Sequence, residues 1–300
     1  MKTLRLARFA STLGLALSLS IGASLSYAHS DKIKTIKVKD NIYMLQGKGG
    51  NVGLFIGNDG TFLIDDKFAP LSHTIIEAIQ GAGGEVPKYL LNTHFHGDHT
   101  GGNLNFGKKG AVIISHDNVR KRLSEGYTIA AFKMKTAPAK APALPSITFS
   151  NNMNLHLNGD DIKATHLKNA HTDGDSVILF SKANVIHTGD IFFNGFFPFI
   201  DAQHGGNMRG MIAATDHILG LVNKDTKIIP GHGPVGGIDD LKVYREMLVT
   251  AHKALLTLKQ QGLTAEQAIE KKPLAALEEK WGKGFLSTDK WIKIVYPAID

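Results

Sequence analysis

The sequence predicts a single α/β domain, because strand-like and helix-like segments alternate along the chain without a break in composition. Three observations carry this prediction. Residues 36–45 show the near-alternation of apolar and polar side chains that is typical of a strand. Asn58-Asp59-Gly60 is a strong hairpin-turn signal between two apolar runs. Residues 241–261 place their apolar side chains on one stripe with helical spacing, so this stripe is expected to pack on the core.

The first half of the domain is predicted to contain more strands than helices. A helix is expected over 71–81, because its isoleucines share one face and Gly81 occupies a C-cap position. The apolar run at 88–93 is expected to be a strand that leads into a histidine-rich segment. The other elements expected here are strands at 51–57, 61–65 and 111–115 and a short helix at 118–124.

The second half is predicted to return to strands and to end in helix. Residues 136–146 contain three prolines and are expected to be a loop, which could form one wall of a site. A second hairpin is expected from Val177 to Asp190. Residues 263–300 carry two tryptophans and could cap the sheet or form a dimer contact, so the oligomeric state stays open. The other predicted elements are strands around Leu155, Ala164 and 227–229 and the helix at 241–261.

Residues 1–28 have the pattern of a signal peptide. A basic start precedes an apolar stretch at 9–21, and Ser26-Tyr27-Ala28 places small residues at the two positions that signal peptidase reads. We expect cleavage after Ala28, because the stretch is rather polar for a permanent membrane span. Residues 29–300 would then be one exported domain, periplasmic or secreted. No later segment is long and apolar enough to cross a bilayer, so no stable membrane anchor is expected.

The composition argues against a nucleic-acid partner. Removal of residues 1–28 takes away three basic and no acidic residues, so the formal net charge falls from +7 to +4. The remaining lysines are scattered and form no basic tract interleaved with aromatic residues. The chain has no cysteine, so disulfides add nothing to an exported protein here. About 270 residues can bury a large core without such links.

The segment His94-Phe95-His96-Gly97-Asp98-His99 carries four potential metal ligands in six residues. Imidazole and carboxylate are ligands that zinc and other first-row metals bind readily. Three more segments place a histidine or aspartate at a strand end beside glycine, and loops at one edge of a sheet can bring such residues together. These additional candidate ligands are His171, Asp190 and His232.

The order and spacing of His-x-His-x-Asp-His, His171, the Gly-Asp pair ending at Asp190 and Gly-His-Gly around His232 resemble the metallo-β-lactamase superfamily. The resemblance covers roughly residues 35–235. It implies an αβ/βα four-layer sandwich, in which two mixed β-sheets face each other, helices flank them, and a two-metal site lies along one edge. A metal-dependent hydrolase with two zinc ions is therefore expected, and iron or manganese is not excluded as the native metal.

The resemblance also implies a role for each ligand. His94, His96 and His171 would hold the first zinc ion. Asp98, His99 and His232 would hold the second, and Asp190 would bridge the two. Asp65 matches a strand-end aspartate of the family and would orient a metal-bound imidazole by a hydrogen bond.

Two divalent ions at such a site would lower the pKa of a shared water toward about 7, so hydroxide would be available at neutral pH. That hydroxide would attack a small-molecule carbonyl substrate, and Asp98 is the expected catalytic proton carrier. Lactones, esters, thioesters and β-lactams are the candidate substrates. Most zinc β-lactamases of the superfamily have a Cys, or a Ser with a relocated ligand, where Asp190 stands, and one subclass has a Lys where Phe193 stands. A bridging Asp instead resembles the lactone, ester and thioester hydrolases.

Two other functions are compatible with the same ligands. A zinc phosphodiesterase is the first, although the chain lacks the basic groove of an RNA-processing relative. A non-catalytic metal-binding or redox protein is the second, although such a scaffold would be expected to lack some of the seven ligands. The remaining histidines are expected to serve structure, with His116 at a loop or helix start, His187 in a strand, and His156 and His166 on the sheet surface. His204 is expected to be exposed, with a place on the pocket lining as the alternative. Most of the phenylalanines at 192–199 are expected in the core, with one or two on a pocket wall.

Overall fold

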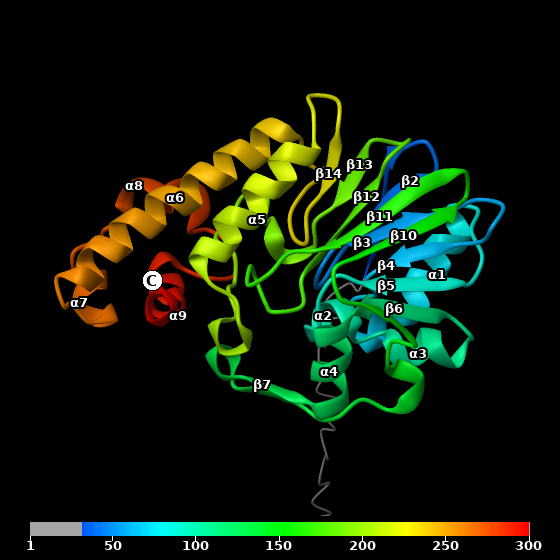
Figure 1. Ribbon diagram of the computed structural model, residues 1–300, viewed down its shortest axis with the longest axis horizontal. Coiled ribbons are helices and arrows are strands. Elements are labelled where there is room, and N and C mark those ends of the chain that lie inside the picture. The colour runs from blue at the N-terminus through cyan, green and yellow to red at the C-terminus, as the bar shows by residue number, and fades with distance from the viewer. Residues whose placement is uncertain (1–31, 300) are drawn as a thin grey trace, which may run out of the picture. The chain divides into compact units, whose positions relative to one another are not determined.

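The computed structural model describes residues 32–299, so the signal peptide predicted at 1–28 lies outside the described residues. Two β-sheets face each other in the described part, and helices cover the outer face of each sheet (Figure 1). The predicted αβ/βα sandwich is therefore confirmed. No helix within residues 32–299 is both long and apolar enough to cross a membrane.

The first sheet is mixed. Its first four strands pair antiparallel, and the parallel pairing that follows begins after a helical crossover. In spatial order its strands are β1 (Lys34–Lys39), β2 (Ile42–Gln46), β3 (Val52–Phe55), β4 (Phe62–Ile64), β5 (Tyr89–Asn92), β6 (Val112–His116) and β9 (Ile147–Phe149).

The second sheet is antiparallel except at one edge, where the last strand runs parallel to its neighbour. Its pairing confirms the hairpin that was predicted from Val177 to Asp190. In spatial order its strands are β10 (Asn152–Leu157), β11 (Asp160–His166), β12 (Ser176–Phe180), β13 (Val185–His187) and β14 (Lys227–Ile229). A separate two-stranded hairpin consists of β7 (Tyr127–Ile129) and β8 (Met134–Thr136).

Helices pack on the outer faces of the sheets. Ile75 and Ile79 of the first helix lie against the first sheet, as their shared face predicts. The helices are α1 (Ser72–Gly81), α2 (Gly97–Thr100), α3 (Asn103–Lys108), α4 (Asp117–Glu125), α5 (Met208–Leu221), α6 (Ile238–Gln260), α7 (Ala265–Glu270), α8 (Ala275–Trp281) and α9 (Thr288–Val295).

Three apolar clusters hold the layers together. One lies between the two sheets, where Phe55 and Phe62 of the first sheet meet Phe180 of the second at ring-centroid distances of 5.1 and 6.4 Å. A second lies under α1 and α3. The third joins the second sheet to α5 and α6 and includes the C-terminal helices. Burial of these side chains is the main force that stacks the sheets.

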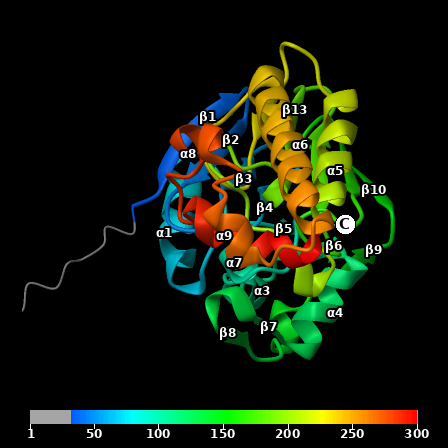
Figure 2. The ribbon, with the colours of Figure 1, turned by 90° about the vertical axis from the view of Figure 1, so that its left-hand side faces the viewer.

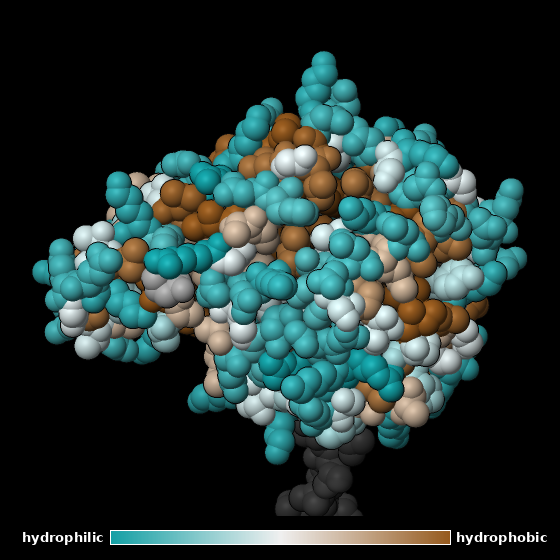
Figure 3. Space-filling model, in the orientation of Figure 1, coloured by the Kyte–Doolittle hydropathy of each residue, from teal (hydrophilic) through white to brown (hydrophobic). Residues whose placement is uncertain are grey.

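Helix α4 shows how one face is buried while the other remains polar. Val119 and Leu123 are its buried side chains. Hydrophilic side chains cover its outer face, as Figure 3 shows over this helix. The helix begins after His116, whose side chain accepts a hydrogen bond from the backbone N–H of Asn118 at 3.2 Å. This N-cap agrees with the prediction that His116 lies at a helix start.

Several element boundaries differ from those predicted. The strand predicted at 36–45 is two strands, β1 and β2, because Asp40 adopts a left-handed φ of 46° and the chain turns there. Helix α1 is capped by Ala82, and the left-handed residue beyond it is Gly83 rather than Gly81. Helix α5 was not predicted.

The C-terminal segment packs on the apolar cluster that includes α5 and α6. Trp281 and Trp291 are both buried in the cluster with α5 and α6. Figure 2 shows α7 and α9 next to the C-terminal end of α6, and α7 and α9 also contact each other. Trp291 stacks on Phe197 with ring centroids 4.4 Å apart, and its indole N–H donates to the carbonyl of Pro198 at 2.6 Å. The segment therefore supports the loop at 192–200.

Candidate metal centre

All seven predicted ligands lie at one edge of the sandwich. His94 and His96 follow the end of β5, and Asp98 and His99 lie in the short helix α2 that comes next. The other three come from loops of the second sheet, one before β12, one just after β13 and one after β14. Their potential ligand atoms form two groups, His94–His96–His171–Asp190 and Asp98–His99–His232, in each of which the atoms lie within 4.8 Å of one another.

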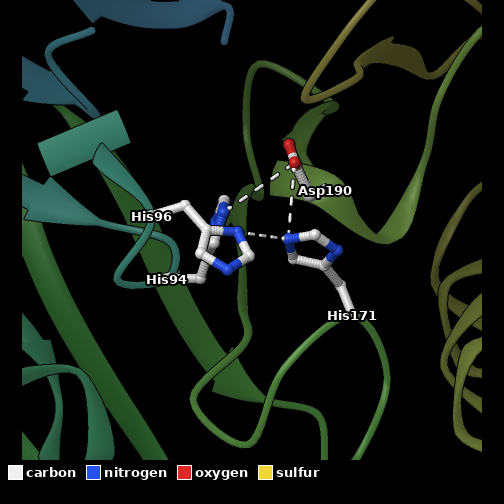
Figure 4. A group of neighbouring side chains, drawn as sticks. All are labelled: His94, His96, His171 and Asp190. Atoms are coloured by element: carbon white, nitrogen blue, oxygen red, sulfur yellow. Dashed lines mark hydrogen bonds and ion pairs between the residues drawn. The ribbon is translucent and has the colours of Figure 1, made fainter. Parts of the chain in front are cut away.

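The first group is shown in Figure 4, where three imidazoles and one carboxylate point toward one another. Nε2 of His171 lies 2.9 Å from Nδ1 of His96. Oδ2 of Asp190 lies 3.5 Å from Nε2 of His171 and 3.8 Å from Nε2 of His94. All four side chains are buried.

Asp190 connects this group to the second one. Its Oδ1 lies 3.1 Å from Nε2 of His99, and its Oδ2 lies 3.4 Å from Nε2 of His232. Asp98 Oδ2 lies 3.4 Å from the same His232 nitrogen and 3.8 Å from Nε2 of His99. One carboxylate thus faces imidazoles of both groups, which is the position required of a bridging ligand.

The imidazoles are oriented by hydrogen bonds on their outward nitrogens. His171 Nδ1 donates to the carbonyl of Phe199 at 2.7 Å. His96 Nε2 donates to Oδ2 of Asp201 at 3.0 Å. An N–H that points outward leaves the inward nitrogen with a free lone pair, which is the form that binds a metal.

Asp65 orients two more rings from the end of β4. Its Oδ2 accepts from His99 Nδ1 at 2.7 Å and from the hydroxyl of Thr93 at 2.7 Å. Since the Thr93 hydroxyl proton is used there, Thr93 Oγ1 accepts from His94 Nδ1 at 3.0 Å. Asp65 is fully buried and has a left-handed φ of 62°, a strained conformation of the kind often found at functional sites.

Two orphaned polar atoms indicate that the centre fits metal ions. His94 Nε2 is buried and has no hydrogen-bond partner among the described residues. Asp190 Oδ1 is also buried, and the His99 nitrogen 3.1 Å from it has no proton to donate when the His99 proton lies on Nδ1 and is given to Asp65. Buried polar atoms are rarely left without a partner. A divalent cation would satisfy both atoms, and imidazole with carboxylate is a donor set that zinc, iron and manganese accept.

The charges at the centre favour a cation as well. Burial opposes the ionisation of Asp190, but the surrounding imidazoles hold its pKa well below the usual range. Burial likewise favours neutral His232, yet the carboxylates of Asp190 and Asp98 raise its pKa to about 9. Burial lowers the pKa of His171 to about 4. The carboxylates are therefore ionised although they are buried. Their negative charge stabilises a cation more strongly there than it would in water.

Two glycines permit close packing around the ligands. A Cβ atom on Gly50 would overlap the His99 ring, and one on Gly231 would overlap Oδ1 of Asp190. Any larger residue at either position would displace a candidate ligand. These glycines therefore allow the backbone to pack directly against the candidate ligands, because they have no side chain.

The sequence patterns missed Asp201 and placed His204 wrongly. His204 was expected to be exposed, but it is buried, because its Nδ1 donates to Asp201 Oδ2 at 2.7 Å. Asp201 thus joins His204 to His96. The signal that could have found this pair is an Asp three residues before a His, directly after an apolar run.

Lys67 was also missed. It is fully buried at a left-handed φ of 58°, and its ammonium group donates to the carbonyl of Gly50. Burial lowers the pKa of Lys67 to about 8, and the carboxylates of Asp98 and Asp65 oppose this shift. The lysine fixes the glycine-rich segment that packs against His99.

The other predicted residues take structural places. His187 is buried in β13, and His156 is exposed on β10 and pairs with Asp161 at 2.7 Å. His166 is half-buried and stacks on His116 with ring centroids 3.7 Å apart. Asp175 accepts from the backbone N–H and hydroxyl of Thr172 at 2.7 and 2.6 Å and so closes a turn.

A pocket of about 380 Å³ opens onto the centre. The prediction of a wall at 136–146 is wrong, because the hairpin β7–β8 just before it supplies the wall instead. Phe193 lines the pocket, as expected for one or two phenylalanines at 192–199, and Phe192 and Phe197 are buried in the core. The lining residues are Gly49, Phe68, His96, Gly97, Asp98, Ile129, Phe132, Met134, Asp190, Phe193, Phe199, His232 and Phe285.

Comparison with known proteins agrees with this architecture. A model of the metallo-β-lactamase superfamily matches residues 45–239. The DIM-1 metallo-β-lactamase is similar with a TM-score of 0.59 and 19% identity, over 73% of this chain and 98% of that one. The metallo-β-lactamase from Pontibacter korlensis has a TM-score of 0.59 and 15% identity, over 73% and 99%.

A third solved structure is FIM-1 from Pseudomonas aeruginosa in its mono-zinc form. It has a TM-score of 0.59 and 15% identity, over 73% of this chain and 96% of that one. At these identities the structural likeness shows the shared fold alone. No curated protein sequence shows significant similarity to the chain.

Proposed function

The chain belongs to the metallo-β-lactamase superfamily, and from this membership we propose that it is an exported hydrolase that holds two zinc ions and cleaves a small carbonyl substrate. The observation that carries the proposal is the place of Asp190, whose two oxygens face His99 on one side and His171 on the other. A carboxylate buried between two imidazole groups is suited to two cations.

The proposed ligands follow the two groups. The first ion would be held by His94, His96 and His171. The second would be held by Asp98, His99 and His232, with Asp190 shared between the two ions. Iron or manganese would fit the same nitrogen and oxygen donors, so the identity of the bound metal has to be determined by experiment.

Metal ions at this centre would supply Lewis acidity and lower the pKa of water toward about 7. Asp98 is proposed to move the proton. Its side chain is 25% exposed, against 5% for Asp190, and it lines the pocket. From there, Oδ2 of Asp98 can accept a proton from the attacking water and return it to the departing oxygen or nitrogen.

The pocket favours a carbonyl substrate over a phosphodiester. No Lys or Arg is among the described residues that line it, so a phosphodiester would meet no cation there beyond those of the metal centre itself. A purely structural metal site is also disfavoured, because structural zinc sites are closed and this centre opens onto a cavity.

The test combines metal content with turnover on the chain from residue 29 onward. Bound metal would be quantified by plasma emission, and hydrolysis of an ester, a lactone, a thioester, a chromogenic cephalosporin and a phosphodiester would be followed. Two zinc ions per chain with turnover of a carbonyl substrate are expected. One ion per chain would contradict the two-ion centre. No bound metal, together with no activity after zinc addition, would overturn the proposal.

Export is tested separately, because it rests on residues 1–28 alone. The full chain would be expressed in a Gram-negative host, and the N-terminal residue of the protein released from the periplasm would be determined. His29 is the residue expected after cleavage behind Ala28. An intact Met1 on a cytoplasmic protein would contradict export without affecting the metal centre.

A further inference from the structure

We propose that the substrate is a carbonyl compound, such as an ester, lactone or thioester, whose uncharged apolar acyl or aryl group fills the pocket beside the metal centre. This inference rests on the proposed hydrolytic function and narrows its substrate class. Three observations support it: the pocket is lined mainly by apolar side chains, its described lining has no Lys or Arg, and some of its apolar side chains are exposed to water.

The pocket is continuous with the metal centre. His96, Asp98, Asp190 and His232 all line it, so a group bound in it would lie next to a carbonyl held at the centre. A volume of about 380 Å³ is within the range of small-molecule sites.

Aromatic rings form most of the remaining lining. Phe193 stacks on His232 with ring centroids 4.9 Å apart and an interplanar angle of 16°. Phe285 lies 6.3 Å from Phe193, and Phe132 lies 4.9 Å from Phe199. These rings come from the β7–β8 hairpin, the loop at 192–200 and the C-terminal segment. Phe68, after β4, adds another ring, so the fold gathers the aromatic lining from four separate places.

The described residues of the lining include no cation that could bind an anionic substrate. The ionisable residues among them are the four that belong to the metal centre. Lys290 lies 5.3 Å from the Phe132 ring centroid, but it lines a neighbouring depression of about 500 Å³ instead. A carboxylate enclosed by phenylalanines would lose its hydration without a partner, which is costly. The part of the substrate in this pocket is therefore uncharged.

Two lining side chains are unusually exposed for their type. Phe285 is 52% exposed and Met134 is 43% exposed, and both lie on the pocket. Apolar area that remains in water in the free protein would be covered when an apolar group binds, which favours binding. Because these residues are exposed, they can also be replaced with little risk to the fold.

The first experiment uses esters that share one leaving group. The 4-nitrophenyl esters of acetate, butyrate, valerate and octanoate would be compared with the 4-nitrophenyl monoester of glutarate, which is anionic and matches valerate in length. We expect kcat/KM to rise about fourfold per methylene until the pocket is filled. The valerate ester is expected to exceed the glutarate monoester at least tenfold in kcat/KM.

Variants of Met134 and Phe285 test whether the substrate preference arises in this pocket. Met134→Lys places a cation at the pocket and is expected to raise the glutarate-to-valerate ratio of kcat/KM at least tenfold. Val243→Lys is the matched control, because Val243 is 44% exposed on α6 and lies outside the pocket, so the ratio should stay unchanged. Phe285→Ala is expected to flatten the dependence on chain length.

The outcomes separate this inference from the proposed function. Hydrolysis of all esters with no chain-length dependence and no discrimination against glutarate would overturn the inference and leave the hydrolase standing. If no substrate is hydrolysed by the metal-loaded protein, the function fails, and the pocket is tested by calorimetric binding of octananilide. Binding that Phe285→Ala weakens would then support the pocket, and no binding would overturn it.

Discussion

Oδ2 of Asp201 lies 3.0 Å from Nε2 of His96 and 2.7 Å from Nδ1 of His204. The other ring nitrogen of His96 faces the candidate metal centre, 2.9 Å from His171. Burial opposes the ionisation of Asp201, but its hydrogen bonds to His204 and His96 lower its pKa. Asp201 belongs to neither group of potential metal ligands. Asp201 therefore positions His96 by fixing the direction of its ring and the nitrogen that carries the proton.

Replacing Asp201 should weaken metal binding. Asp201→Asn removes the negative charge that holds the His96 N–H, and about a 10- to 100-fold loss in zinc affinity is expected. Competition with a chromogenic chelator measures it. Asp225→Asn, on an exposed loop, is the matched control and should leave the affinity unchanged. Equal affinities in the two variants would show that Asp201 serves only the fold.

The glycine beside the bridging carboxylate should tolerate no side chain. Gly231→Ala makes a Cβ overlap Asp190 Oδ1, so a loss of about 1–3 kcal/mol in the free energy of unfolding and a loss of bound metal are expected. Gly220→Ala is the control, because Gly220 lies in α5 and its Cβ would meet no atom within 4 Å. It should stabilise the protein by up to about 1 kcal/mol. Denaturant unfolding checks both values.

Asp98 can be tested as a proton carrier apart from its role as a ligand. Asp98→Asn keeps the size of the side chain and an oxygen donor but removes the basic carboxylate, and kcat is expected to fall about 10²- to 10⁴-fold. Metal content must be measured on the same sample. Full activity with both ions bound would refute the proton-carrier role.

Removal of metal should lower the thermal stability of the fold. Ions bind the native centre, whereas the unfolded chain does not assemble it, so free zinc at a thousandfold excess over Kd would add about 4 kcal/mol to the free energy of unfolding. Calorimetry before and after dialysis against a chelator measures the change. A melting temperature unaffected by the chelator and by added zinc would contradict a metal site built from these residues.

The packing of Trp291 in the C-terminal segment should affect both substrate binding in the pocket and the stability of the fold. Trp291→Ala removes a buried ring that stacks on Phe197, and about 3–5 kcal/mol of stability is expected to be lost. Trp291→Phe keeps a ring but leaves the carbonyl of Pro198 without its donor, which should cost about 1–3 kcal/mol. Because this contact supports the loop at 192–200, KM for an apolar ester should rise in both variants. An unchanged KM would show that Trp291 contributes to stability alone and does not shape the pocket.

Much of the fold could be predicted because it follows from local patterns. The hairpin at Asn58-Asp59-Gly60, the helix α1 and the helix α6 each depend on the order of apolar and polar residues within a short window. The same is true of the segment from His94 to His99, whose position after an apolar strand was visible directly. Helix α5 was not predicted, and β1 and β2 merged into one predicted strand because the turn at Asp40 interrupts the alternation only briefly.

The sequence by itself determined the α/β class, the types of the seven candidate ligands and their placement at strand ends. Only the tertiary structure decided that Asp201 also orients a ligand, since the contact between Asp201 and His96 spans 105 positions of the chain. It also decided that His204 is buried and that Phe285 meets Phe193 and Phe132 at one pocket. The physical reason is that periodicity and turn chemistry act between near neighbours, whereas the partner of a buried polar or aromatic group is chosen by how the sheets and helices pack.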